Sequence, residues 1–160
     1  MSMRLSEHAD IDLMVEQDIG GTNASNDGGW LSMKDYSRAT FYVEIATFDS
    51  GDDLDECRIQ QATDSSGTGA KDLTTDGSGL NYDSDNPVDA DGDFVIIEIR
   101  GEDMDVDGGF DHIRGYVAEG GNSGVDNVMG VLIRYGSAHP KKELQGAAST
   151  GSQVYVDINT

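Results

Sequence analysis

Short runs in which apolar and polar residues alternate recur along the chain, separated by stretches rich in Gly, Asn, Asp and Ser. β-Branched and aromatic residues dominate these runs, which is typical of strands with one buried face. The pattern predicts strands at residues 39–48, 55–62, 93–101, 112–119, 127–136 and 153–159. The run DFVIIEIRG at 93–101 is the most apolar, so we expect it at the centre of a sheet.

Turn residues between these runs predict antiparallel connections. The sequence DSGDD separates the strands at 39–48 and 55–62, and GGNSGVD separates those at 112–119 and 127–136, so we expect a hairpin at each. Helical periodicity is weak. Residues 3–17 are the best helical candidate, although IDLMV within them fits a short strand equally well. The chain is therefore expected to be all-β, an antiparallel β-sandwich or barrel-like domain with long polar loops and little helix.

The length of 160 residues predicts a single domain. We expect an N-terminal arm at 1–28, core strands over 29–136, and a loop with a last strand at 137–160. Two long polar connectors, at 65–92 and 137–152, are of the kind that is functional or ordered by a partner. The chain has no apolar run of about 20 residues and no secretory pattern at its start, so neither a membrane span nor a signal peptide is expected.

The charge narrows the possible partners. Thirty-one acidic residues stand against ten basic ones, for a net charge of −21. Such a surface repels phosphate, so we expect no binding to nucleic acid or to an anionic membrane. Self-repulsion destabilises a compact chain in dilute buffer, whereas at molar salt the screening length falls to about 3 Å. The composition resembles that of proteins from halophilic organisms and their viruses.

One acidic motif has the spacing of a calcium loop. In DMDVDGGFD, Asp103, Asp105 and Asp107 occupy positions 1, 3 and 5, and Gly108 occupies position 6. Position 12, which requires a bidentate glutamate, is Arg114, and the flanking segments are strand-like rather than helical. We therefore expect a solvated turn and assign no metal site, with calcium binding by the three aspartates as the alternative.

Catalytic motifs are sparse. None of the three histidines lies in HExxH, and GxSxG is absent. The segment GTGAK at 67–71 is followed by Asp72, where a phosphate-binding loop has Ser or Thr. Cys57 is the only cysteine, so no disulfide can form within the chain, and we expect a buried, inert thiol. We predict a protein that is not an enzyme and has no cofactor.

Two stretches together resemble a type of head protein of tailed viruses. The first contains W-[VL]-S-[ML]-K-x-Y followed by T-F-x-V, and its matching residues are Trp30, Ser32, Met33, Lys34, Tyr36, Thr40, Phe41 and Val43. The second contains Q-A-T-D-x-x-G-T-G-A-K at 61–71. The segments at 109–118 and 131–141 also fit, so the likeness covers about two thirds of the chain.

This resemblance implies a capsid decoration or cement protein that stabilises the outer capsid surface. It implies an oligomer, most simply a homotrimer, bound to the major capsid protein of a virion that is assembled in the host cytoplasm. The acidic composition points to a tailed virus of a salt-loving host. The alternatives are another virion component, such as a turret or tail protein, and a secreted calcium-dependent β-sandwich for adhesion.

Five residues are candidates for subunit or capsid contacts. Trp30 and Tyr36 are amphipathic anchors that suit a core edge or an interface. Lys34 lies among aromatic residues and either caps a local turn or contacts a second subunit. Lys141 and Lys142 form a local positive patch in a loop, which is either solvated or docks on an acidic shell protein.

Overall fold

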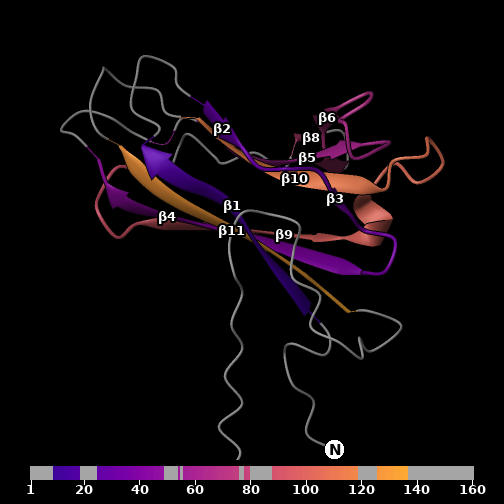
Figure 1. The fold of residues 1–160 in the computed structure, drawn as a ribbon, viewed down its shortest axis with the longest axis horizontal. Helices are drawn as coiled ribbons and strands as arrows, with labels where there is room; N and C mark the ends of the chain where they lie inside the picture. Colours follow the sequence, from indigo (N-terminus) through magenta and orange to yellow (C-terminus); the bar gives the residue numbers. More distant parts are fainter. Residues whose placement is uncertain are drawn as a thin grey trace, which may run out of the picture.

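The computed structural model describes residues 9–18, 25–48, 54, 56–75, 78–79, 88–118 and 126–136. These residues form two antiparallel sheets that pack face to face, which confirms the all-β sandwich (Figure 1). The only helical element among them is the 3-10 turn η1, Gly101–Asp103. No helix in these ranges has the length and apolar composition needed to cross a membrane.

The first sheet, sheet A, contains four strands in the order β1-β11-β4-β9. Their bounds are Ala9–Asp18 for β1, Asn127–Tyr135 for β11, Arg38–Thr47 for β4 and Phe94–Arg100 for β9. Every neighbouring pair is antiparallel. Among the strands that the structure describes, β1 and β9 are therefore the two edges of sheet A.

Sheet B has the order β2-β10-β5-β6, and β3 pairs with β10 on the same side as β2. The bounds are Ser25–Asp27 for β2, Leu31–Ser32 for β3, His112–Ala118 for β10, Glu56–Ala62 for β5 and Lys71–Asp72 for β6. A separate two-stranded hairpin joins β7, Thr74–Thr75, to β8, Ser78–Gly79.

Residues 9–18 form an integral strand of sheet A rather than part of an arm, so the strand alternative for IDLMV is confirmed and the helical one is wrong. Two further expectations are wrong. Both expected hairpins are instead connections between the sheets, because β4 and β11 lie in sheet A while β5 and β10 lie in sheet B. The apolar run at 93–101 contains β9, which is an edge strand rather than a central one. The predicted strand at 153–159 lies outside the described residues.

The core lies between the two sheets. Strand β4 shows a two-residue alternation, with Ala39, Phe41, Val43 and Ile45 buried against sheet B. The Phe41 ring fills the centre, because a Cβ added at Gly115 of β10 would lie 2.4 Å from it. Cys57 is fully buried, and burial raises the pKa of its thiol to about 12, so it is protonated and inert as expected.

Candidate interaction surfaces

The segments that carry the viral resemblance meet at one end of the sandwich. The backbone of Asp111 joins two of them, since its N–H donates to the Ala62 carbonyl at 3.2 Å and its carbonyl accepts from the Met33 N–H at 2.8 Å. Asp111 thus links three of the chain segments that carry the resemblance. These segments form one end of sheet B.

Trp30 lies between β2 and β3, at the interrupted edge of sheet B. The Arg114 guanidinium lies 4.5 Å from the centre of its ring, a cation–π distance. Gly67, with a φ of +81°, lies against the indole, because a Cβ there would come within 2.4 Å of Nε1. The half-buried Trp30 therefore packs on the loop that leaves β5.

Lys34 projects from the turn after β3 and remains largely exposed. Its Nζ lies 2.9 Å from Asp111 Oδ2, with 68% of the Lys34 side chain accessible. This lysine is the main cause that holds the pKa of the Asp111 carboxyl below its usual range, and the neighbouring His112 contributes. His112 Nδ1 is 2.5 Å from the other carboxylate oxygen. Lys34 therefore secures the turn to β10.

Tyr36 is buried, which differs from an exposed subunit anchor. Its hydroxyl donates to Asp10 on β1, and its ring centre lies 4.7 Å from the Arg134 guanidinium. Arg134 Nη2 lies 2.9 Å from Asp12 Oδ2, and Nη1 donates to the Ser32 carbonyl at 2.7 Å. These side chains form a buried polar cluster at the β1 edge.

Two of the three aspartates of the calcium-like motif have other partners. Asp103 accepts the Arg100 N–H at 2.8 Å, and Asp105 pairs with Lys71 Nζ at 2.6 Å. Lys71 is the main cause that lowers the pKa of Asp105. Within the ranges the structure describes, no three His, Cys, Asp or Glu residues are grouped as metal ligands. The other lysine candidates, Lys141 and Lys142, lie outside those ranges.

The outer face of sheet A, the side turned away from sheet B, was not predicted as a site. The strand registers place Leu13, Val131, Tyr42 and Ile96 in one row across all four strands. Leu13 is 42% exposed and Ile96 54%, and Phe94 and Met129 in the next row are 57% and 38% exposed. The Phe94 and Tyr42 rings stack at 5.8 Å between centroids. This face is therefore mainly apolar, although Glu44 lies between Met129 and Phe94 in their row.

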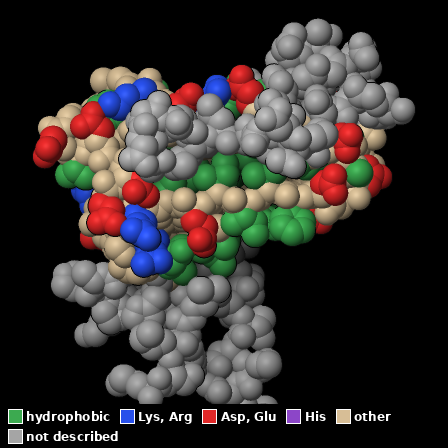
Figure 2. Space-filling view, turned by 180° about the vertical axis from the view of Figure 1, so that it is seen from behind, with side chains coloured by type: hydrophobic (Ala, Val, Ile, Leu, Met, Phe, Trp, Pro, Cys, Tyr) green, Lys and Arg blue, Asp and Glu red, His purple; other side chains and the backbone are tan. Residues whose placement is uncertain are grey.

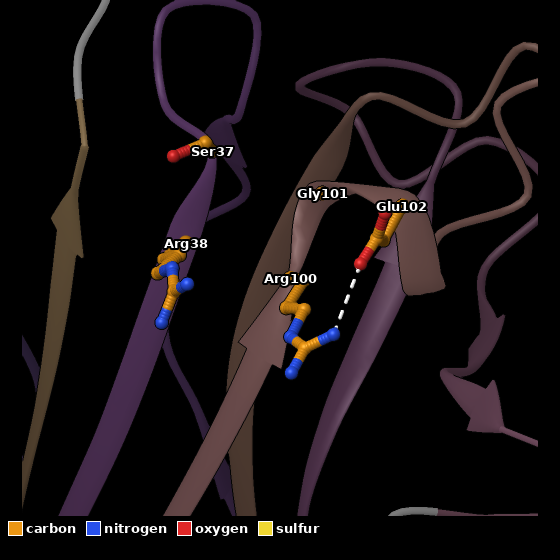
Figure 3. Close-up of a pocket in the computed structure, with 5 residues that line it drawn as sticks. All are labelled: Ser37, Arg38, Arg100, Gly101 and Glu102. Carbon is orange, nitrogen blue, oxygen red and sulfur yellow. Dashed lines mark hydrogen bonds and ion pairs between the residues drawn. The ribbon is translucent and has the colours of Figure 1, made fainter.

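Two arginines stand side by side at one end of this outer face. Arg38 of β4 and Arg100 of β9 are directly opposite in the register, although like charges in such positions are unfavourable. They line a shallow pocket of about 330 Å³ together with Ser37, Gly101 and Glu102 (Figure 3). Arg100 pairs with Glu102 at 3.1 Å.

Comparisons with family models, curated proteins and solved structures find no match to this chain. A functional inference therefore depends on the geometry above and on the motif resemblance. The surface that most resembles a binding site is the outer face of sheet A, for which the sequence held one signal. In FVIIEIR, β9 is apolar at successive positions, which means apolar on both faces.

Proposed function

We propose that the protein is a structural component of a virus particle that decorates the capsid and stabilises its outer surface. It is not an enzyme in this proposal. It acts mechanically, as a homo-oligomer whose copies bridge neighbouring subunits of the major capsid protein. The virus is a tailed virus of a halophilic host, and the trimer implied by the motif resemblance remains a prediction.

The observation that carries this proposal is the exposed apolar outer face of sheet A. Soluble proteins rarely expose large apolar patches unless these bind a partner. Such a patch is unexpected on a chain with a net charge of −21, which is rich in polar residues. Leu13, Phe94, Ile96 and Met129 are nevertheless all exposed on that face. A mainly apolar sheet face suits a protein surface such as a capsid lattice.

The motif resemblance supports the proposal independently. Its residues Trp30, Lys34 and Lys71 stabilise one end of sheet B through Arg114, Asp111 and Asp105 respectively. Residues that maintain a scaffold are what a family of non-catalytic shell proteins has reason to share. The motif end lies on sheet B, which leaves the outer face of sheet A available for a lattice.

Co-sedimentation with capsid shells tests the proposal. Shells assembled from the major capsid protein of the same virus are mixed with the full chain in molar KCl and pelleted. We expect saturable binding to the shells. Leu13→Asn combined with Met129→Gln removes apolar surface from the outer face and should weaken binding by about tenfold, which corresponds to 1.4 kcal/mol.

The matched control is Val106→Asn. Val106 is 63% exposed but lies in the turn after η1, away from sheet A, so its replacement should leave binding unchanged. Absence of binding by the unmodified chain would refute the capsid role. Equal losses in the outer-face variant and the Val106 variant would show that the outer face of sheet A is not the docking surface.

A further inference from the structure

Strand β9 has the composition of a central strand but lies at a sheet edge. Phe94 and Ile96 face outward and are more than half exposed, while Val95 and Ile97 on the inner side are only partly buried. Figure 2 shows a band of hydrophobic side chains on the side of the molecule turned away in Figure 1. A second strand beside β9 would cover apolar side chains on both faces at once.

Alternate residues of β9 direct their backbone N–H and C=O groups away from β4, toward the edge of the sheet. The Ile45 N–H donates to the Asp93 carbonyl at 2.9 Å, and the Gly101 N–H donates to the Ser37 carbonyl at 2.8 Å. The register between β9 and β4 has no shift, so the odd-numbered residues of β9 bond to β4. The N–H and C=O groups of Phe94, Ile96 and Glu98 therefore point to the open edge. The Arg100 N–H is already held by Asp103.

The other described edges carry features that discourage pairing. Strand β1 has a register shift between Leu13 and Val15, and it turns Asp10 and Asp12 inward. The edges of sheet B consist of strands only two or three residues long. Bulges, inward charges and short edge strands all oppose edge-to-edge association. Strand β9 has seven residues, no proline, no lysine and no bulge.

We propose that two copies of this chain associate through β9. The two β9 strands pair antiparallel across a two-fold axis and join two four-stranded sheets into one continuous sheet. The pairing is isologous, so each copy contributes the same residues. This inference does not depend on the capsid role, and the two-fold dimer differs from the homotrimer that the motif resemblance implies.

One register satisfies the constraints of both strands. Centring the axis on Ile97 aligns all seven residues and sets Ile96 opposite Glu98 of the second copy. Both are residues whose N–H and C=O groups point to the open edge, so they can exchange hydrogen bonds. Arg100 then lies opposite Phe94 of the second copy, and no like charges are directly opposite. The strand is complementary to itself, which favours a second copy as the occupant.

Light scattering and sedimentation of the full chain in molar KCl test the association. We expect a concentration-dependent dimer with a dissociation constant on the order of micromolar, as for small interfaces. Ile96→Pro removes an N–H that points to the open edge and none that bonds to β4, so the fold should survive, as circular dichroism would verify. Its dimer should be weaker by at least about tenfold.

Ile96→Thr is the matched control, because it removes the apolar side chain but keeps the N–H. Its dimer should persist with a smaller loss than that of Ile96→Pro. Equal losses in the two variants would show face-to-face packing of the outer surfaces and overturn edge pairing. An unmodified chain that stays monomeric at high concentration, or that forms trimers without dimers, would overturn the proposal as well.

Disulfide trapping tests the register. In the proposed pairing, Ile97 meets its own symmetry mate in a pair without hydrogen bonds, where the Cα atoms lie about 4.5 Å apart, within the range for a disulfide. Ile97→Cys should therefore form a dimer linked by a disulfide under mild oxidation. Val95→Cys, also inward-facing but distant from its mate, should not. Equal yields from the two variants would refute this register. The native Cys57 is buried and unreactive.

Discussion

The two edge strands of sheet A, β1 and β9, differ in how readily another strand could pair with them. At β1, two carboxylates turn inward to Arg134, and a bulge interrupts the ladder with β11. At β9, the ladder with β4 is regular and the side chains are apolar on both faces. Both strands pair with a neighbour in the centre of the sheet, so their differences arise from the residues at the edges rather than from the topology.

The comparison shows how one sheet limits association to one side. A buried ion pair is a weak source of net stability, because desolvation offsets much of its attraction. The Asp12–Arg134 pair is therefore better explained by what it prevents than by what it stabilises. An incoming strand at β1 would meet inward-turned carboxylates and a bulge. In the proposed dimer β9 is paired and β1 opposes a further strand, so the sheet would not grow beyond two copies.

The largest expected effect comes from removing the cation at the closed edge. Arg134→Met leaves Asp12, only 2% exposed, without its partner, and also removes the guanidinium beside Tyr36. Breaking one side of a buried pair costs about 3–5 kcal/mol. Denaturant unfolding in molar KCl should show this loss.

Two further variants sharpen this result. Arg100→Met at the open edge breaks only the exposed pair with Glu102 and should change stability by less than about 1 kcal/mol. Asp12→Leu combined with Arg134→Met removes both buried charges and should recover most of the stability. The double variant should also self-associate beyond the dimer, since β1 has then lost an inward charge. If Arg134→Met and Arg100→Met lowered the free energy of unfolding equally, the two edges would not differ in the way described.

Most of the strands could be predicted from the sequence, but the difference between the β1 and β9 edges could not. Alternation in RATFYVEIAT was enough to predict β4, because each buried position recurs every second residue. The Asp12–Arg134 pair, however, joins residues 122 positions apart, and no local spacing indicates it. Turn residues marked where the chain reverses, but they do not tell whether the next strand joins the same sheet or crosses to the other.

The composition of β9 predicts a central strand, whereas the structure has it at an edge. An apolar run without alternation indicates burial on both faces, which is normally a central strand. The structure places the strand at an edge, and the proposed pairing would make it central only in the dimer. Sequence reasoning about one chain cannot separate these cases, because the second neighbour is another molecule.

The next effect in size concerns the edge of sheet B that holds Trp30. Trp30→Ala removes the ring between Arg114 and Gly67, and because the indole is half-buried we expect a loss of about 2 kcal/mol, below the 3–5 kcal/mol of a fully buried ring. The β9 dimer should be unaffected, since Trp30 lies outside sheet A. Unchanged stability together with a lost oligomer would instead make Trp30 a subunit anchor.

Salt should distinguish buried from exposed charges. Between dilute buffer and molar KCl, screening of the net charge of −21 should raise the melting temperature by at least about 2–4 °C, the shift that 1 kcal/mol gives in a chain of this size. The same screening should strengthen association through β9. The cost of Arg134→Met should persist at high salt, because buried pairs are screened less. A melting temperature that stays flat or falls with salt would remove the argument for a halophilic host.

The smallest expected effect is at Lys34, whose exposed pair with Asp111 contrasts with the buried pair at β1. Because Lys34 lowers the pKa of Asp111 in the folded state, the pair adds stability above the unfolded pKa of about 3.9, and this gain is lost as the pH falls through the lower folded value. Lys34→Met should therefore cost less than about 1 kcal/mol at neutral pH and nothing below the folded pKa. Urea unfolding at a series of pH values in low salt measures this difference.

Lys34→Arg should keep the pH dependence, and the effect of Lys34→Met should vanish when Asp111→Asn is already present. A cost that persists at acid pH would show that the Lys34 stem, rather than its charge, holds the turn to β10.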